Sequence, residues 1–416
     1  MMSGTIEKTS RRNPMLRVGG IVMVVAGLAY GIPSCYFYFA SPQIAARAQV
    51  DVLQGRTDSA RSRVSRVLWF HPQNPHAQLT LGKIELADQA TSEAIACFRS
   101  IPPDSDLHPL ASFQLAKTYA LDGQLTAAEM ELQQYIGQYE PTQAVWDLYF
   151  RLLYLQTRTR DIITLFERKL AATLESLSDA RFLLKVEFVP QEPLETLAAL
   201  EDIHERHPDD INAQVALAVA LMRANDQGRA EQLLRLALQR KPDHHRARLV
   251  LAQFYANRQQ FSLAEEVLWL LGGYPDSEST AGIAQDDRFW SLSSRLAEQN
   301  AETAVALQYV DRALQIREND KLYLSQRAQI LRQLGNKEEA TIASKKSIEA
   351  GQFEQDLFLL ARQFEDRPIS PVDCTTIAHL YRKLSRLPRA ELWDRLAVGM
   401  NQTQGGISAP DGIRIQ

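Results

Sequence analysis

The sequence of 416 residues contains few cysteines and none of the common catalytic signatures. Its three cysteines are Cys35, Cys97 and Cys374, and no two of them form a C-x-x-C pair. This spacing argues against a disulfide framework and against a cysteine-ligated zinc site. No Walker loop, glycine-rich dinucleotide turn, G-x-S-x-G elbow or H-E-x-x-H sequence occurs. We therefore expect no catalytic residue, no metal and no cofactor.

A strong charge imbalance is also absent. The chain has 46 Lys and Arg residues against 50 Asp and Glu residues, a formal net charge of −4. This balance gives no sign of a nucleic-acid partner. Charged residues make up 23% and hydrophobic residues 45%, which excludes a polytopic membrane protein and a wholly disordered chain. Length alone suggests two or three domains, unless the chain is built from repeats.

Histidines cluster at only two places, His204 with His207 and His244 with His245. Both pairs lie beside a proline at the end of an expected helix. Two histidines three residues apart could share a metal, but no third ligand follows at a fixed spacing. We interpret both pairs as helix-end or solvent-exposed residues.

The longest uncharged stretch lies near the N-terminal end. Its apolar part covers 18–40, and at about 1.5 Å per residue it is long enough for a hydrocarbon core of about 30 Å. The preceding residues are rich in lysine and arginine. By the positive-inside rule, the pattern predicts a cytoplasmic tail at 1–17, a single-pass transmembrane helix at 18–40 and a periplasmic location for the rest.

Three other interpretations of this stretch stay open, namely a cleaved signal peptide, a lipoprotein signal and a buried helix of a soluble fold. A cleaved signal peptide requires small residues at the cleavage site, and Tyr38-Phe39-Ala40 fits poorly. Ile32-Pro33-Ser34-Cys35 loosely resembles a lipoprotein signal, although the proline is unfavourable there. The sequence favours a retained anchor.

The rest of the chain repeats every 34 residues. Each frame holds two stretches with apolar residues at i, i+3, i+4 and i+7, which is typical of two amphipathic helices. The frames are 41–74, 75–108, 109–142, 143–176, 177–210, 211–244, 245–278, 287–320, 321–354 and 371–404. Short insertions are expected at 279–286 and 355–370.

Two columns of small residues run through these frames. Position 8 carries Ala48, Gly82, Ala116, Ala218, Ala252, Ser294, Ala328 and Ala378, and position 20 carries Ala60, Ala94, Ala128, Ala230, Ala264, Ala306, Ala340 and Ala390. Small side chains at both positions let paired helices approach closely. Two frames break the columns, with Phe150 and Ile162 in one and Leu184 and Thr196 in the other. We expect a change of superhelical pitch there.

This pattern resembles the tetratricopeptide repeat family, whose motif joins W-x2-L-G-x2-Y, A-x3-F and a final proline. Frame 211–244 carries Leu217-Ala218, Ala230 with Leu234, and Pro242. One helix pair cannot bury its apolar face, so the frames must stack. We predict an all-α fold: a right-handed superhelical solenoid of helix pairs over 41–404, preceded by one transmembrane helix and followed by a disordered tail at 405–416.

The resemblance implies a protein-interaction scaffold that binds partners on the face lined by the first helices. Position 9, a groove position in this family, carries a basic ladder of Lys83, Lys117, Arg151 and Lys185. Aromatic residues interleave with it, namely Phe113, Tyr154 and Phe188. We predict that these seven residues bind a partner with acidic segments, because regularly spaced cations attract a multivalent anion. The competing interpretation is a solvated groove in which lysine stems cover apolar surface.

Three functions follow from these features. The favoured one is a membrane-tethered scaffold of an envelope assembly, such as secretion, envelope biogenesis or polysaccharide export. The second is binding of an anionic polysaccharide or acidic peptide in the groove. The third is a cytosol-facing adaptor in signalling. The sequence leaves the oligomeric state and the identity of the partner open, because repeat grooves take whichever side chains the partner needs.

Overall fold

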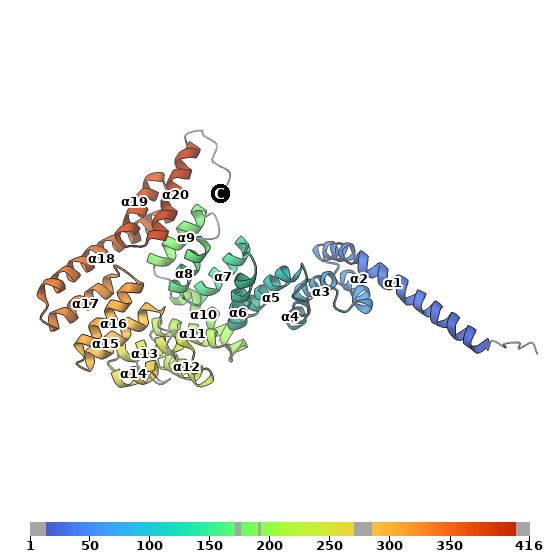
Figure 1. Ribbon diagram of the computed structural model, residues 1–416, viewed down its shortest axis with the longest axis horizontal. Helices are drawn as coiled ribbons and strands as arrows, with labels where there is room; N and C mark the ends of the chain where they lie inside the picture. Colours follow the sequence, from blue (N-terminus) through green and yellow to red (C-terminus); the bar gives the residue numbers. More distant parts are fainter. Residues whose placement is uncertain (1–13, 171–175, 190–192, 270–284, 405–416) are drawn as a thin grey trace, which may run out of the picture. The chain divides into compact units, whose positions relative to one another are not determined.

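The protein is helical throughout the residues that the structure describes. The computed structural model describes residues 14–170, 176–189, 193–269 and 285–404, with side chains from Tyr30 onward (Figure 1). These ranges hold 20 helices and no strand, so the all-α prediction is confirmed for them. The chain divides into two compact units, each of which is described separately.

The helices alternate as first and second members of the sequence frames. In chain order they are α1 (Pro14–Leu53), α2 (Thr57–Phe70), α3 (Pro75–Ala87), α4 (Thr91–Arg99), α5 (His108–Asp122), α6 (Leu125–Gln138), α7 (Gln143–Leu155), α8 (Thr159–Leu170), α9 (Leu177–Phe188), α10 (Pro193–Arg206), α11 (Ile211–Arg223), α12 (Gln227–Arg240), α13 (His245–Asn257), α14 (Phe261–Trp269), α15 (Asp287–Gln299), α16 (Thr303–Ile316), α17 (Lys321–Gln333), α18 (Lys337–Asp366), α19 (Pro371–Lys383) and α20 (Leu387–Gln404). Every even-numbered helix begins at the seventeenth residue of its frame.

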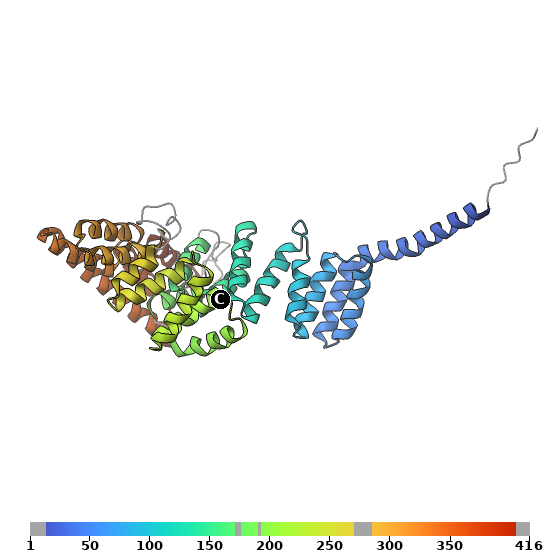
Figure 2. The same cartoon turned by 90° about the horizontal axis from the view of Figure 1, so that it is seen from below.

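The first unit covers residues 1–122 and 127–145. Helices α1 to α4 each pack on the next helix in the chain, and α3 also contacts α1 and α5. Figure 2 shows these blue helices standing side by side. The core between α1, α2 and α3 contains Ala48, Ala60, Val64, Val67, Ala77 and Ile84. The first small-residue positions of the frames therefore lie at the centre of the helix contacts.

The predicted membrane helix and the location built on it are corrected by the structure. From Tyr30 onward, α1 packs on protein: the Tyr30 and Phe37 rings lie 5.3 and 5.1 Å from the Phe70 ring of α2. The carbonyl of Ser34 lies 2.8 Å from Nε2 of His71. No helix in the described part of the chain is long and apolar enough to cross a membrane.

Phe37 of this stretch thus serves helix packing and gives the same sequence signal as a lipid-facing residue, whereas Tyr36, Tyr38 and Phe39 are exposed on the surface of α1. Residues 18–29 of the predicted span lie outside the residues whose side chains are described. The disordered tail predicted at 405–416 and most of the tail predicted at 1–17 also lie outside the description.

The second unit covers residues 123–126 and 146–416. From α10 to α20 each helix contacts the next one in the chain, and α8 contacts α9. Three further contacts join distant parts of the sequence: α18 with α9, and α20 with both α8 and α9. Figure 1 shows α19 and α20 in red beside α9 in green. The C-terminal helices therefore pack on α8 and α9, which belong to the two frames that break the small-residue columns. The repeat period does not predict this arrangement.

The predicted insertion at 355–370 lengthens one helix. The second helix of frame 321–354 continues without a break, so that α18 contains 30 residues. It ends at Asp366, two residues before Pro368, because the residue preceding a proline is disfavoured in the helical conformation. The other predicted insertion, at 279–286, lies largely outside the described residues.

The small-residue columns are buried at the helix contacts. Ala116, Ala218 and Ala252 at position 8 are 0% exposed, as are Ala94 and Ala128 at position 20. The tightest described glycine is Gly82, where an added Cβ would lie 2.5 Å from Cε1 of Phe98. Phe98 is itself only 2% exposed, so its ring has little room to move. The close packing of α3 on α4 therefore requires a glycine at position 82, because any Cβ there would collide with the Phe98 ring.

We expect Gly82→Ala to lower the free energy of unfolding. Overpacking a core costs about 1–3 kcal/mol, against a gain of roughly 1 kcal/mol in helix propensity. The matched control is Gly137→Ala on α6 of the same unit, where an added Cβ meets nothing within 4 Å. Urea unfolding of the full chain checks both variants, and an equal stabilisation by the two would contradict the close approach.

Candidate functional site

The four cations of the basic ladder have different surroundings. Lys117 on α5 and Arg151 on α7 are exposed, and neither forms an ion pair in the described part of the chain. Lys83 on α3 is half-buried, and burial lowers its pKa. Lys185 on α9 lies 3.1 Å from Oε1 of Glu365 on α18. Lys83 and Lys117 belong to the first unit and the other two to the second, so the structure does not assemble one described cluster from them.

The three aromatic residues of the ladder take part in packing. Phe113 is half-buried on α5. The Tyr154 ring lies 6.2 Å from the ring of Phe182. Phe188 lies 6.2 Å from the Tyr381 ring, and the Arg386 guanidinium lies 5.7 Å from the Phe188 centroid. Phe188 therefore supports the contact between α9 and α19.

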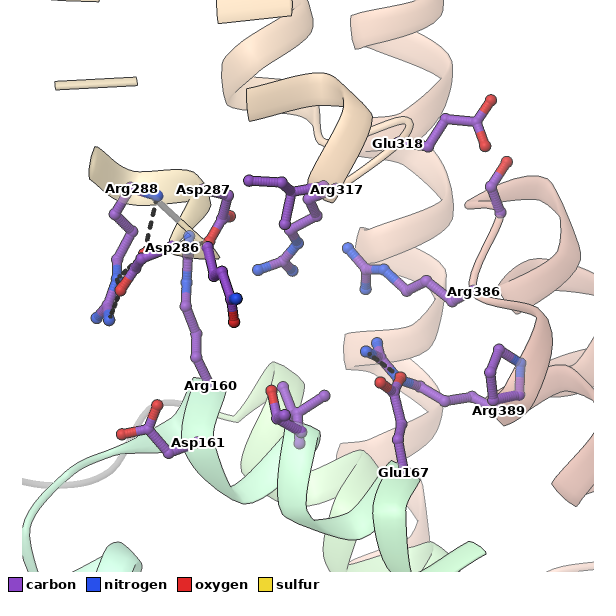
Figure 3. Close-up of a pocket in the computed structure, with 16 residues that line it drawn as sticks. Arg160, Asp161, Glu167, Asp286, Asp287, Arg288, Arg317, Glu318, Arg386 and Arg389 are labelled. Atoms are coloured by element: carbon purple, nitrogen blue, oxygen red, sulfur yellow. Dashed lines mark hydrogen bonds and ion pairs between the residues drawn. The ribbon is translucent and has the colours of Figure 1, made fainter. Parts of the chain in front are cut away.

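A second candidate site, not predicted from sequence, is a charged cavity of about 500 Å³ within the second unit (Figure 3). Its walls come from α8, the start of α15, the end of α16, the turn between α19 and α20, and the start of α20. Five arginines line it, namely Arg160, Arg288, Arg317, Arg386 and Arg389, together with the carboxylates Asp161, Glu167, Asp286, Asp287 and Glu318.

One buried carboxylate behind the cavity holds two of these arginines. The side chain of Glu187 on α9 is 3% exposed. Its Oε1 accepts hydrogen bonds from Nη1 of Arg386 at 2.6 Å and from Nη1 of Arg389 at 2.5 Å. Its Oε2 accepts from the Tyr381 hydroxyl at 2.9 Å. Arg389 also donates through Nη2 to Glu167 of α8 at 2.9 Å.

These partners decide the charge state of Glu187. Burial by itself raises a carboxyl pKa. Here the positive charges of Arg389, Arg386 and Arg317 and the Tyr381 hydrogen bond outweigh burial, and the pKa of Glu187 lies below its usual value. Burial raises the pKa of Tyr381 well above its usual range, so its hydroxyl stays a donor. The contact of α9 with the last helix pair therefore combines a buried ionic cluster with the packing of Phe188 on Tyr381.

The opposite wall of the cavity is also tied together by ion pairs. Arg160 pairs with Asp287 and donates through Nη2 to the Tyr323 hydroxyl at 3.1 Å. That hydroxyl donates to Oδ2 of Asp287 at 2.7 Å. Arg288 pairs with Asp286, its Nη2 lying 2.5 Å from Oδ2. Arginines and carboxylates thus alternate along this wall.

Arg317 is the exception among the five arginines. Its nearest described carboxylate contact is from Nε to Oδ2 of Asp320 at 3.2 Å. No hydrogen bond from its two terminal nitrogens is found among the described residues. Burial lowers the pKa of Arg317, and the like charges of Arg386 and Arg160 lower it further.

No single sequence feature predicts this cavity. Glu187 and Arg389 are separated by 202 positions. The only available signal is that frames 143–176 and 177–210, which supply α8 and α9, break both small-residue columns. That irregularity marks the two frames as unusual, without naming their partner.

The histidine pairs do not form a described metal cluster. His244 caps the start of α13, where its Nδ1 accepts from the backbone N–H of Ala247 at 3.1 Å, in line with the helix-end interpretation. Burial and nearby cations lower the pKa of His244 to about 4. Within the described ranges, no group of three or more possible metal ligands occurs.

Comparison with known families identifies one repeat directly. Residues 211–254 match the family model described as the tetratricopeptide repeat. This segment of the chain is therefore a tetratricopeptide repeat. The match begins at the first residue of α11 and contains α11, α12 and most of α13, all of which lie in frames with both small-residue columns intact.

The solved structures similar to this chain are distant. "MamA MSR-1 C2" has a TM-score of 0.32 at 19% identity, covering 42% of this chain and 94% of that chain. "MamA 41-end from Desulfovibrio magneticus RS-1" has a TM-score of 0.33 at 17% identity, covering 42% and 93%. At these scores the likenesses carry no argument about function. No curated protein matches the sequence.

We expect Glu187→Gln to destabilise the second unit strongly at pH 7, by about 3–5 kcal/mol, because it leaves two buried arginines without their anion. The folded-state pKa of Glu187 is lowered. The stabilisation is therefore present above the unfolded-state pKa of about 4.3 and is lost as the pH falls through the folded-state pKa. Urea midpoints of the wild type and the variant should accordingly converge below about pH 4.

The matched control is Glu201→Gln on α10 of the same unit. Glu201 pairs with Arg229 at 3.1 Å, but its side chain is 37% exposed. Exposed pairs contribute less than about 1 kcal/mol. A loss of similar size in the two variants would show that the burial of Glu187 has no special effect.

Proposed function

We propose that the protein is a scaffold that binds protein partners through its tetratricopeptide repeats and has no catalytic role of its own. The observation that supports this most is the series of ten successive helix pairs, each starting its second helix at the same frame position. Repeats of this kind bury residues against their neighbours and leave the outward positions of the first helices available to a partner.

The two exposed cations of the ladder indicate the chemistry of the partner. Lys117 and Arg151 lack a described ion pair, whereas Lys185 is engaged by Glu365 and Lys83 is half-buried. An exposed cation without a carboxylate neighbour attracts acidic side chains of an incoming segment and speeds the encounter. We infer that a partner of this scaffold carries acidic segments.

The proposal names the chemistry of the partner and no cellular assembly. The envelope role expected from sequence depended on a membrane anchor, and the described residues contain no helix able to cross a membrane. The repeats retain their proposed binding role without that assignment, because it follows from their exposed residues.

Charge reversal tests the role of these cations. We expect Lys117→Glu and Arg151→Glu, made singly, each to weaken binding of a labelled oligoglutamate peptide, and the double variant to weaken it further. The expected loss of affinity is about two- to fivefold per site at low salt, where exposed charges are least screened. Fluorescence anisotropy at two salt concentrations measures it.

The control is Lys345→Glu on α18, which makes the same change of charge at a side chain that is 79% exposed. This variant reports the effect of net charge away from the ladder, together with the loss of an exposed ion pair of Lys345 with Glu349. Equal peptide affinity in the Lys345 and Lys117 variants would refute a specific contribution of the ladder position.

A further inference from the structure

The charged cavity of the second unit contains one arginine, Arg317, whose hydrogen-bond donors are only partly satisfied by the described residues. Arg386 and Arg389 are engaged by Glu187, Glu354 and Glu167, and Arg160 by Asp287. Arg317 keeps only its Nε contact with Asp320, and its terminal nitrogens have no described hydrogen bond. Five donors on a fixed planar fork give a guanidinium strong capacity for an external anion.

The guanidiniums converge on one region. Figure 3 shows Arg317 pointing down into the cavity and Arg386 pointing toward Arg317 from the side, with the Arg389 guanidinium below them. Like charges placed so closely repel, in agreement with the lowering of the Arg317 pKa by Arg386. An anion between them would remove this repulsion and supply the missing acceptors.

The carboxylates of the cavity leave this region accessible to an anion. Four of the five pair with arginines: Asp161 with Arg158, Glu167 with Arg389, Asp286 with Arg288 and Asp287 with Arg160. The fifth is Glu318, whose side chain turns away from the arginines in Figure 3. The helices α8, α15 and α20 each contribute first-turn residues to the wall, where the helix dipole adds positive potential.

We propose that this cavity binds a phosphate group carried by a larger molecule. A carboxylate offers two oxygens in one plane and suits a single fork. Here Arg317 and Arg386 approach from different directions, which suits the three acceptor oxygens and the charge of nearly −2 on a phosphate. The volume of about 500 Å³ exceeds that of a single phosphate and falls within the range of small-molecule sites.

Two sources could supply this group: a small phosphorylated compound or a phosphorylated side chain of a partner. Isothermal titration of the full chain compares inorganic phosphate, an alanine-flanked phosphoserine peptide and its unphosphorylated form. Binding of inorganic phosphate with no gain from the peptide supports the first source. Tighter binding of the phosphopeptide, displaced by inorganic phosphate, supports the second.

Arg317 variants decide whether either binding uses this cavity. We expect Arg317→Gln to weaken phosphate binding by about tenfold or more, because a charge-assisted pair is lost, and Arg317→Lys to weaken it less. The matched control is Arg332→Gln on α17, an exposed arginine with one described hydrogen bond, to Ser344 at 2.9 Å. Its phosphate affinity should equal that of the wild type.

A thermal melt of each variant, recorded without ligand, separates loss of binding from loss of folding. If Arg317→Gln melts early, the lysine variant carries the test, since it keeps the positive charge next to Asp320. No binding of either phosphate probe by the wild type, or binding that the folded Arg317 variants leave unchanged, overturns the proposal.

Discussion

The arrangement of the second unit depends on one buried carboxylate. Glu187 holds two arginines and a tyrosine that come from the other end of the sequence, and its side chain is 3% exposed. A charge buried so deeply is tolerated only when its partners are all in place. Apolar surfaces can slide over one another, but three hydrogen bonds to one carboxylate fix which residues meet. The pairing of α9 with the last helices is therefore specified by the directionality of these hydrogen bonds as well as by the burial of apolar surface.

The same contact positions the charged cavity. Glu187 accepts hydrogen bonds from Arg386 and Arg389, and Glu167 accepts one from Arg389. These bonds fix the orientation of both arginine side chains. A guanidinium has five N–H donors, so Arg386 keeps donors for a further anion although it is bound to Glu187 and Glu354. Arg317 then completes the arrangement from the end of α16. The structural ion pairs and the proposed phosphate site therefore share residues, and among the five lining arginines only Arg317 has both terminal nitrogens without a described acceptor.

Whether a contact could be predicted from the sequence depends on how far apart its two residues lie in the chain. Contacts within a repeat recur every 34 residues, so buried positions such as Ala116 and Ala230 were found from their period. The contact of Glu187 with Arg389 joins residues 202 positions apart and recurs nowhere, so the cavity could not be found. The membrane prediction failed for another reason: rings such as Phe37 give the same apolar signal whether they face lipid or the Phe70 ring.

The two proposed binding modes differ in how well they discriminate between partners. Exposed cations such as Lys117 act through water, where attraction is weak and any acidic segment is attracted. Arg317 lies in a cavity where burial lowers its pKa, and the electrostatic attraction between it and an anion is correspondingly less screened. Fixed guanidiniums there also impose a geometry that rejects anions of the wrong shape. On this view the exposed first-helix cations favour encounter, and selectivity resides in the cavity of the second unit.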